Sequence, residues 1–382
     1  MKIGVLTLHT HEIKVYGEIA CRNKQAYCQQ HGYSLIVAES RDPSRPAAWM
    51  KIPLLQKHLP DFDWMFWTDA DSLITNREIP LEAFINPWSD LIITRDGNHI
   101  NAGEYFIRNC EWSFQFLAEV WAQQDLIHHG WWEQAAMIRL YPKHYHHFSI
   151  LPPRAFNSFE SNWHPGDFII HFPATSTAYR HDRMRTFEAY CLDESCPPSL
   201  RIAQRGDFPG LLNRLNLIGE AVEVGVTRGC FARHILDQWE GKRLHLVDAW
   251  RNLPGYPSID NVNDEEHERR YRDTLARLAG LEDRFLVHRC LSSEAASRFE
   301  SATLDFVYLD ANHRYDAVQE DLSHWYPKLR HGGILAGHDF LDGNLPAGEF
   351  GVRSAVLDFA SRVGARVFHT YEMDWPSWYL IK

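Results

Sequence analysis

Residues 62–74 read FDWMFWTDADSLI, and this stretch decides the fold of the first half of the chain. Trp64–Trp67 is a short run of large apolar residues between polar ones, too short for helical periodicity to develop, so it predicts a buried strand. The strand leads directly into Asp69 and Asp71. Because open α/β folds bind ligands at the carboxyl ends of their strands, we expect both carboxylates at a ligand-binding edge of a sheet.

The spacing of Asp69 and Asp71 indicates a metal site. Two carboxylates one residue apart repel each other, and a divalent cation with oxygen ligands relieves that repulsion. A cation held there can also bind a diphosphate, and D-x-D is the pattern of metal-dependent glycosyltransferases that use nucleotide-sugars. The alternative is that both residues serve only in a turn or a helix cap. Their position directly after an apolar strand favours the metal site.

The composition is that of a globular protein with room for two domains. The chain has 382 residues, of which 45% are hydrophobic and 23% charged. Charged residues interrupt its most apolar runs, so we expect no transmembrane segment. The first residues, MKIGVLTLHTHEIK, predict a strand over Lys2–Leu8 rather than a secretory signal, and hence a cytoplasmic location.

Charge and cysteine content disfavour several classes of protein. The net charge of −11 argues against a nucleic-acid partner, because proteins that bind nucleic acids usually carry a basic face. The seven cysteines are irregularly spaced and form no C-x-x-C pair, which disfavours both a disulfide framework and a thiolate zinc site. We therefore expect reduced cysteines.

The chain begins with a β-α-β pattern, which predicts a parallel sheet with a right-handed crossover. Its parts are the strand Lys2–Leu8, a helix over Ile19–Gly32 and a strand over Tyr33–Ala38. Further predicted elements are a helix over Ala47–His58, strands over Asp90–Thr94 and Tyr105–Arg108, a helix over Glu111–Gln124, and a strand within Gly166–Phe172 that leads into His171.

Residues 1–180 resemble a known family. The motifs, in order, are W-x-K-I-P-L-L (Trp49–Leu55), F-W-T-D-A-D (Phe66–Asp71), N-A-G-x-x-x-I-R-N (Asn101–Asn109), W-x-E-Q-A-A (Trp131–Ala136) and H-F (His171–Phe172). This set resembles the retaining α-glycosyltransferases that include galactomannan galactosyltransferases and xyloglucan xylosyltransferases. The resemblance implies a GT-A fold, a UDP-sugar donor of the galactose or xylose type, a glycan or glycoconjugate acceptor, and Mn²⁺ bound by Asp69, Asp71 and His171.

The same resemblance suggests residues near the sugar and the phosphates. They are Glu104, Glu133, Gln134 and Asp167 as candidates beside the sugar, Asn101 as a hydrogen-bond donor, Gly103 for close approach of the backbone to a ligand, and Lys51 beside a phosphate. Retention of configuration requires a carboxylate nucleophile or same-face attack, and both stay open. The alternatives are a helical first turn for Glu133 and Gln134, a core histidine for His171 and a solvated charge for Lys51.

A second α/β pattern starts after a predicted connector at residues 181–200. Gly219–Leu236 reads GEAVEVGVTRGCFARHIL and predicts a strand, a turn with Gly225 and Gly229, and a helix whose N-terminus faces a ligand. The pattern E-x-G-x-x-x-G differs from the dinucleotide fingerprint. Asp248 follows the next strand, Arg243–Val247, and is placed to accept hydrogen bonds from ribose hydroxyls; its alternative is a helix cap.

Later strands end in further polar groups. Strands over Arg284–His288, Leu304–Leu309 and Ile334–Ala336 precede, in turn, Ser292-Ser293, Asp310-Ala311-Asn312-His313 and His338-Asp339. A helix is predicted over Ala317–Trp325, and residues 374–380 predict a final strand at an antiparallel edge of the sheet.

Residues 201–382 resemble class I S-adenosylmethionine-dependent methyltransferases, in particular the metal-dependent O-methyltransferases that act on sugars of macrolides. The resemblance implies that Glu223, Gly225, Gly229 and Asp248 hold S-adenosylmethionine, with Ser292 or Ser293 near the adenine. It also implies Mg²⁺ on Asp310 and Asp339, with His338 where relatives often carry a second acid, and His313 as general base. The alternative for His313 is a helix cap.

Together these features predict an α/β chain of two domains. A GT-A nucleotide-sugar-binding domain (1–180) and a linker (181–200) precede a Rossmann-like class I methyltransferase domain (201–382). The predicted function is bifunctional: sugar transfer from a UDP-sugar and O-methylation of a sugar hydroxyl. The alternatives are a methyltransferase with a non-catalytic glycan-binding module, or one that acts on a small molecule other than a carbohydrate.

Overall fold

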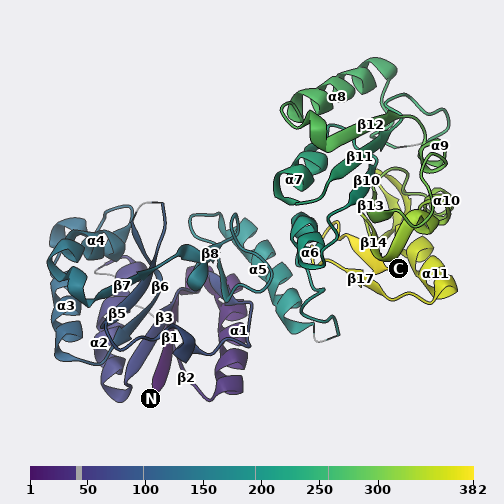
Figure 1. The fold of residues 1–382 in the computed structure, drawn as a ribbon. Helices are drawn as coiled ribbons and strands as arrows, with labels where there is room; N and C mark the ends of the chain where they lie inside the picture. Colours follow the sequence, from purple (N-terminus) through teal and green to yellow (C-terminus); the bar gives the residue numbers. More distant parts are fainter. Residues whose placement is uncertain (40–44, 98, 194, 257) are drawn as a thin grey trace. The chain divides into compact units, whose positions relative to one another are not determined.

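The computed structural model describes residues 1–39, 45–97, 99–193, 195–256 and 258–382, and it divides into two compact units (Figure 1). The first unit is Met1–Asp193 and the second is Glu194–Lys382. Each unit contains a sheet with helices on both faces, so the predicted two-domain α/β class is confirmed. Among the described residues, no helix combines the length and the apolar character that crossing a membrane requires.

A six-stranded sheet forms the centre of the first domain, in the order β2-β1-β3-β6-β5-β7. Strand β1 pairs in parallel with β2 and β3, which confirms the predicted β-α-β start, whereas β6 is antiparallel to β3 and β5. The strands are β1 (Ile3–His9), β2 (Ser34–Glu39), β3 (Trp64–Thr68), β5 (Leu91–Arg95), β6 (Ile100–Arg108) and β7 (Phe148–Leu151).

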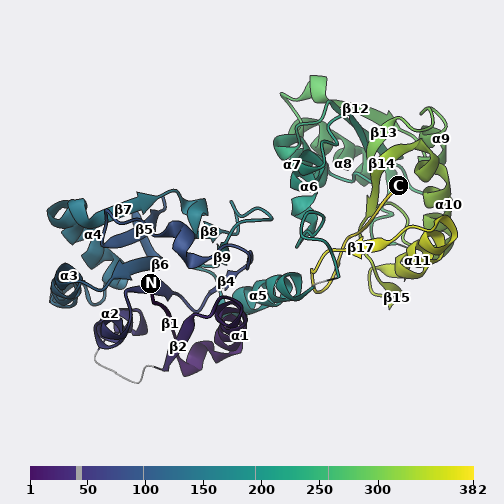
Figure 2. The ribbon, with the colours of Figure 1, turned by 60° about the horizontal axis from the view of Figure 1, so that its bottom comes forward.

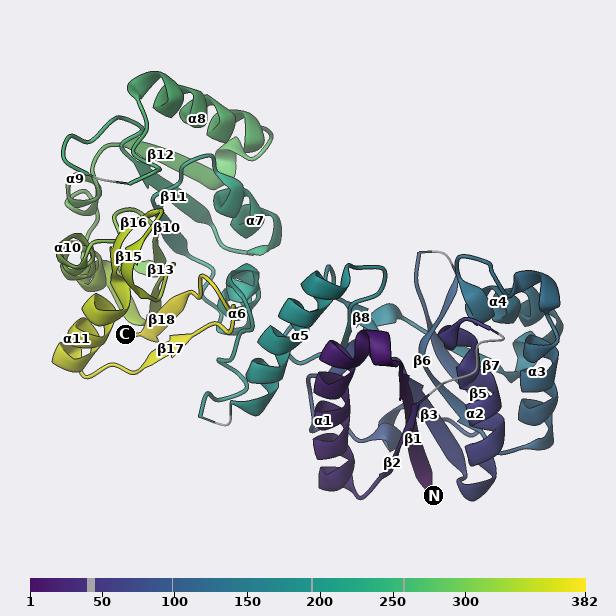
Figure 3. The same ribbon diagram turned by 180° about the vertical axis from the view of Figure 1, so that it is seen from behind.

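Helices cover both faces of this sheet, because its strands carry apolar side chains on both faces. Leu6 and Leu8 of β1 pack into the core under α2, α3 and α4, whereas Ile3 and Val5 pack on the other face with Tyr27 of α1. Figure 3 shows α1 and α5 side by side, with α2, α3 and α4 across the sheet from α1. The helices are α1 (Lys14–His31), α2 (Lys51–His58), α3 (Glu111–Trp121), α4 (Trp132–His144) and α5 (Thr177–Leu192).

A small second sheet, in the order β4-β9-β8, brings the residues that follow Asp71 next to His171. Strand β4 pairs antiparallel with β9, and Ser72 lies opposite His171 in this pairing. The residue that follows Asp71 is thus fixed against His171, although the two are far apart in the sequence. The strands are β4 (Ser72–Ile74), β8 (Ser158–Phe159) and β9 (Ile169–His171).

Two segments of the first domain differ from the expectation. Strand β6 begins at Ile100, so Asn101 and Gly103 lie within a strand. Residues 181–200 were expected to form a connector with little structure, but α5 continues to Leu192 within the first unit. The bidentate contact of Arg22 with Glu188 (3.0 and 3.2 Å) ties α5 to α1.

The second domain contains a seven-stranded sheet in the order β12-β11-β10-β13-β14-β18-β17. The first five strands of that order are parallel, while β18 is antiparallel to both neighbours. The final strand therefore lies between β14 and β17 rather than at the predicted edge. The strands are β10 (Glu220–Val224), β11 (Arg243–Asp248), β12 (Phe285–Arg289), β13 (Leu304–Leu309), β14 (Leu329–Gly337), β17 (Val367–His369) and β18 (Trp378–Ile381).

Both faces of this sheet are covered as well. Ala221 of β10 faces the core that contains α6 and α7, and its neighbour Val222 faces the core that contains α10 and α11. Figure 2 shows α6 and α7 on the opposite side of this sheet from α10 and α11. A hairpin of β15 (Asp342–Leu345) and β16 (Gly348–Gly351) follows β14. The helices are α6 (Phe208–Arg214), α7 (Cys230–Gln238), α8 (Asp264–Arg277), α9 (Ser292–Ala296), α10 (Tyr315–Trp325) and α11 (Val352–Val363).

Candidate active sites

Asp69, Asp71 and His171 come together at the end of β3. Each offers one ligand atom, and these atoms lie within 4.8 Å of one another. His171 Nε2 is 3.2 Å from Asp71 Oδ1. The pairing of β4 with β9 creates this meeting, since it sets His171 beside the residue that follows Asp71. Two carboxylates and an imidazole form a donor set that suits a borderline divalent cation such as Mn²⁺.

The other ring nitrogen of His171 is held by a buried polar network. Nδ1 lies 2.8 Å from Asn157 Oδ1 and 3.3 Å from Glu104 Oε2, two acceptors that favour a proton on this nitrogen, while Nε2 faces Asp71. Burial opposes a charge on His171, but Glu104 and Asp71 outweigh it and raise its pKa to about 9. Burial raises the pKa of Glu104 to about 7. Glu104 thus lies behind His171, a candidate metal ligand, rather than at an open edge of the site.

Gly103 and Asn101 serve the same network. A Cβ atom at Gly103 would lie 2.5 Å from His171 Cε1. The glycine therefore makes room for the imidazole, whereas the sequence had suggested room for a ligand. Asn101 Oδ1 accepts hydrogen bonds from Gly103 N (2.9 Å) and from Asn157 Nδ2 (2.8 Å). The Asn101 Nδ2 group donates to Asp96 (2.8 Å), so Asn101 positions its neighbours instead of facing a substrate.

Lys51 is fully engaged inside the domain and does not extend toward a phosphate. Its Nζ lies 2.7 Å from Glu133 Oε1, 3.3 Å from Asp69 Oδ1 and 2.8 Å from the carbonyl oxygen of Ala102. Three acceptors match the three protons of an ammonium group. Burial opposes the charge on Lys51, but Asp69 and Glu133 outweigh it and raise the pKa. Trp67 Nε1 also donates to Asp69 Oδ1 (2.7 Å), which orients this carboxylate.

Glu133 and Gln134 lie in the first turn of α4, at the edge of the same site. Gln134 Oε1 accepts a hydrogen bond from Ala102 N (2.9 Å), which turns its NH₂ group away from that backbone. Glu133 Oε2 and the hydroxyl of Tyr105 are buried and have no hydrogen-bond partner. Buried polar atoms without partners are uncommon in folded proteins, and their presence beside Asp69 fits a region that receives polar ligand groups.

Arg180 and Tyr16 belong to this site although the sequence did not single them out. Arg180 Nη2 lies 3.4 Å from Asp71 Oδ2, its Nη1 donates to Tyr16 (2.8 Å) and its Nε donates to the carbonyl oxygen of Phe172 (2.9 Å). Arg180 comes from α5, in a segment interpreted as leading into a connector. The one feature of the sequence that could have indicated this role is the position of an arginine nine residues after His171.

Asp167 lies outside this cluster of side chains. Its two carboxylate oxygens take a bidentate contact from Arg154 (3.0 and 2.8 Å), and Oδ2 also accepts from Ser158 Oγ (2.8 Å). The predicted contact of Asp167 with the sugar therefore finds no support: the side chain fixes the turn before β9.

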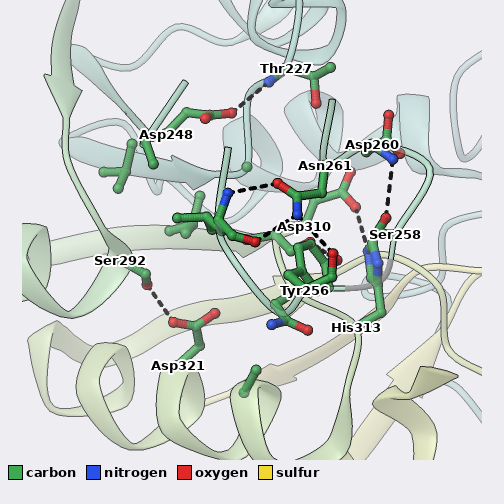
Figure 4. A pocket seen from close by; sticks show the side chains of 18 of the residues that line it. Thr227, Asp248, Tyr256, Ser258, Asp260, Asn261, Ser292, Asp310, His313 and Asp321 are labelled. Atoms are coloured by element: carbon green, nitrogen blue, oxygen red, sulfur yellow. Dashed lines mark hydrogen bonds and ion pairs between the residues drawn. The ribbon is translucent and has the colours of Figure 1, made fainter. Parts of the chain in front are cut away.

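The second domain contains a cavity of about 630 Å³ at the carboxyl ends of its parallel strands (Figure 4). Its lining includes the predicted residues Gly225, Asp248, Ser292, Ser293, Asp310, His313, His338 and Asp339. Five different strand ends and the segment that contains Tyr256 and Asn261 contribute to it. Asn261 holds this segment by hydrogen bonds to Leu253 N, Leu253 O and Tyr256 O (2.7 to 2.8 Å).

Gly225 is required by the backbone. Its φ is +89°, and a Cβ atom there would lie 2.0 Å from the carbonyl oxygen of Asp310. Glu223 and Gly229, also predicted to hold the cofactor, are not among the described residues that line the cavity. Glu223 is buried, which raises its pKa to about 8, and Gly229 packs against Thr274 at the start of α7.

Asp248 stabilises the glycine turn from the end of β11. Its Oδ2 accepts hydrogen bonds from Val226 N (3.0 Å) and Thr227 N (2.9 Å), and Oδ1 accepts from Trp250 N (2.7 Å). Burial raises its pKa. Oδ1 accepts only one of these bonds and keeps one acceptor site, so a ribose hydroxyl can still bind there.

Four side chains meet at the ends of β13 and β14. Asp310, His338 and Asp339 offer ligand atoms that lie within 4.8 Å of one another. His313 Nε2 lies 3.1 Å from Asp339 Oδ2 and 3.4 Å from Asp310 Oδ1, between the two carboxylates. Because His338 contributes nitrogen, this donor set suits Mn²⁺ better than Mg²⁺, which prefers oxygen ligands alone.

Arg205 is a further residue that sequence reasoning missed. Its Nη2 lies 2.9 Å from Asp310 Oδ2, and its guanidinium group stacks on Phe231 and Tyr308. Burial opposes a charge on Asp310, but Arg205 and His313 outweigh it and lower its pKa to about 2. Arg205 keeps this carboxylate charged and oriented.

Ser292 binds a buried carboxylate next to the cavity. Its hydroxyl donates to Asp321 and accepts a hydrogen bond from Trp325 Nε1 (2.9 Å). Burial raises the pKa of Asp321 to about 7. The serine thus joins α9 to α10 while lining the cavity (Figure 4).

Each domain is similar to a known protein family. Residues 7–89 and 85–181 match the model of the galactosyl transferase GMA12/MNN10 family, and residues 222–340 match a methyltransferase domain model. The chain thus resembles a galactosyltransferase family in its first domain and a methyltransferase in its second, and we name the two domains after these matches. This confirms the two resemblances found in the sequence.

Individual relatives cover the galactosyltransferase-family domain. An alpha-1,2-galactosyltransferase of Schizosaccharomyces pombe is 27% identical over 209 residues, covering 41% of this chain and 56% of the relative. Galactomannan galactosyltransferase 1 of Cyamopsis tetragonoloba is 30% identical over 113 residues, covering 26% of each chain. This chain thus spans about half, or less, of the length of these relatives.

Two solved structures align with part of the chain. A glycosyltransferase involved in the glycosylation of the major capsid of PBCV-1 aligns with a TM-score of 0.43 and 19% identity, covering 48% of this chain and 98% of its own. An O-methyltransferase from Bacillus cereus in complex with SAH aligns with a TM-score of 0.34 and 16% identity, covering 53% and 90% respectively.

Proposed function

We propose that the galactosyltransferase-family domain transfers a galactose-type or xylose-type sugar from a UDP-sugar to a glycan or glycoconjugate acceptor. The observation that carries this proposal is the meeting of Asp69, Asp71 and His171 within 4.8 Å, with a buried network behind the histidine. These residues would hold Mn²⁺, whose charge would stabilise the leaving UDP. Arg180, anchored by Tyr16 and Phe172 and next to Asp71, would donate to the same diphosphate.

UDP-sugar hydrolysis tests this proposal. We expect UDP release from UDP-galactose or UDP-xylose in the presence of Mn²⁺, and we expect its loss in Asp69→Ala. Asp61→Ala, at an exposed acid before β3, is the matched control and should keep the wild-type rate. If neither donor is hydrolysed and UDP does not bind, the domain has no donor site, and the reading as a non-catalytic module takes its place.

We propose that the methyltransferase domain binds S-adenosylmethionine in the 630 Å³ cavity and methylates a sugar hydroxyl. Gly225, Asp248 and Ser292 would contact the cofactor, whereas Asp310, His338 and Asp339 would hold a divalent cation that lowers the pKa of the acceptor hydroxyl. His313 lies beside both carboxylates and is the candidate to take the proton.

The aromatic side chains of Tyr256, Phe350 and Trp375 also line the cavity, and such rings suit the apolar face of a sugar.

Calorimetric titration with S-adenosylmethionine tests this second proposal. We expect binding to the wild type and to Asp316→Ala, which changes an exposed acid of α10, and a loss of affinity in Asp248→Ala. Equal binding by Asp248→Ala would contradict the assignment of this carboxylate. Product masses after incubation with UDP-sugar, S-adenosylmethionine and acceptor would show whether methylation depends on prior glycosylation, as the fusion of two transferases suggests.

A further inference from the structure

Two neighbouring indole rings lie exposed at the entrance to α4. Trp131 and Trp132 have exposed fractions of 44% and 46%. Large aromatic side chains are normally favoured in a core, since each can bury a large apolar area. Two adjacent exposed tryptophans therefore indicate a surface that binds an apolar or partly apolar group.

The turn that carries these two rings has an unusual backbone conformation. Trp132 has φ of +43°, a left-handed conformation that is unusual for a bulky residue and costs free energy. His129 stabilises the turn: its carbonyl oxygen accepts a hydrogen bond from Trp132 N (2.9 Å), and its Nδ1 accepts one from Trp131 N (3.1 Å). The His129 ring also contacts the Trp131 ring edge to face at 5.6 Å.

The same turn leads directly into the candidate active site. The residue after Trp132 is Glu133, whose Oε1 lies 2.7 Å from Lys51 Nζ, and Lys51 in turn reaches Asp69. The side-chain oxygen of Gln134, Oε1, accepts a hydrogen bond from Ala102 N. Glu133 Oε2 is buried without a hydrogen-bond partner. Aromatic faces beside an oriented amide are the groups that recognise a sugar ring, which has an apolar face and a rim of hydroxyls.

We infer that Trp131 and Trp132 form the acceptor subsite of the galactosyltransferase-family domain. A sugar ring of the acceptor glycan would stack on these indoles, with its hydroxyls toward the half-buried Gln134. This inference rests on the proposed glycosyl transfer, and it adds that the acceptor is bound through a pyranose face rather than through a charged group.

Steady-state kinetics of the full chain test the subsite. In Trp131→Ala and Trp132→Ala we expect the KM for an oligosaccharide acceptor to rise roughly tenfold, as expected for the loss of one aromatic contact. The rate of UDP-sugar hydrolysis without acceptor should stay within about twofold, because that reaction uses no acceptor. Trp88→Ala is the matched control: Trp88 is 88% exposed and should leave both quantities unchanged. Trp132→Tyr should keep most of the acceptor affinity.

A binding experiment separates failure of the subsite from failure of the proposed reaction. Mannose, glucose and xylose tetrasaccharides are titrated calorimetrically into wild type, Trp131→Ala, Trp132→Ala and Trp88→Ala, all compared by thermal melting. Weaker binding in the two subsite variants alone supports the inference even if no UDP-sugar is hydrolysed. Equal binding in all four proteins, no binding of any oligosaccharide to the wild type, or a change of oligomeric state in the variants would overturn it.

Discussion

The Lys51 ammonium group lies 2.7 Å from the carboxylate of Glu133, in a position closed to solvent. The same nitrogen lies 3.3 Å from Asp69, so one buried cation joins the D-x-D strand end to the first turn of α4. Lys51 therefore couples the charge of Asp69, in the F-W-T-D-A-D motif, to the charge of Glu133, in the W-x-E-Q-A-A motif.

Removal of this cation should destabilise the domain strongly. In Lys51→Met, Glu133 would stay buried without its partner, and breaking a buried pair in this way costs about 3–5 kcal/mol. Hydrogen exchange of the full chain, measured separately for peptides of α2 and α4, should show the loss. Lys57→Met, an exposed position of the same helix, should change the free energy of unfolding by less than about 0.5 kcal/mol. Adding Glu133→Gln to Lys51→Met should recover part of the stability; no recovery would contradict the paired-charge account.

Arg180 should contribute to the affinity for the donor. With Mn²⁺ present, Arg180→Ala is expected to weaken UDP binding roughly ten- to hundredfold, the range for loss of one charge-assisted hydrogen bond. Arg180→Lys should bind with intermediate affinity because it keeps the charge but not the fork of donors. Isothermal titration with UDP measures this, and Arg185→Ala, an exposed arginine of α5, serves as control. Wild-type affinity in Arg180→Ala would remove this residue from the donor site.

The two candidate metal sites should respond independently to substitution. A cation that binds only the folded state, at a hundred times its Kd, stabilises its domain by about 2.7 kcal/mol. In a calorimetric scan with Mn²⁺, Asp71→Asn should abolish the stabilisation of the first domain alone, and Asp339→Asn that of the second alone. Each variant is thus the control for the other. If Asp71→Asn removed both effects, the clusters would not be separate sites.

Local sequence patterns predicted the parts of the fold that depend on neighbouring residues. A short apolar run before Asp69 was enough to predict β3, and the glycine turn after Val224 was enough to predict β10 and the start of α7. The helix α5 could not be predicted in this way. Its buried residues form only a narrow stripe around Met184 and Phe187, and its ion pair with Arg22 lies far away in the sequence.

The roles of polar residues were harder to predict because they depend on contacts between distant segments. Lys51 has the appearance of a phosphate-binding lysine until Glu133 and Asp69 are seen to occupy it. Gly103 appears to serve a ligand until the His171 ring is seen against it. Family motifs name such residues, but only the packing of β6, β9 and α4 decides which atoms they meet.

A final prediction concerns the pH dependence of the methyltransferase domain. Because burial raises the pKa of Asp321 to about 7, the folded domain keeps this proton between pH 4 and 7 while the unfolded chain loses it. Stability therefore falls as pH rises through this window, by an amount on the order of 4 kcal/mol for this group alone. Asp321→Asn has no proton to lose, and its amide oxygen can still accept from Ser292, so the variant should lose less stability than the wild type on going from pH 4 to pH 7. Urea unfolding at a series of pH values measures the two slopes, with Asp316→Asn, an exposed position of α10, as the control. Parallel slopes for Asp321→Asn and the wild type would mean that this carboxyl group is already charged when folded.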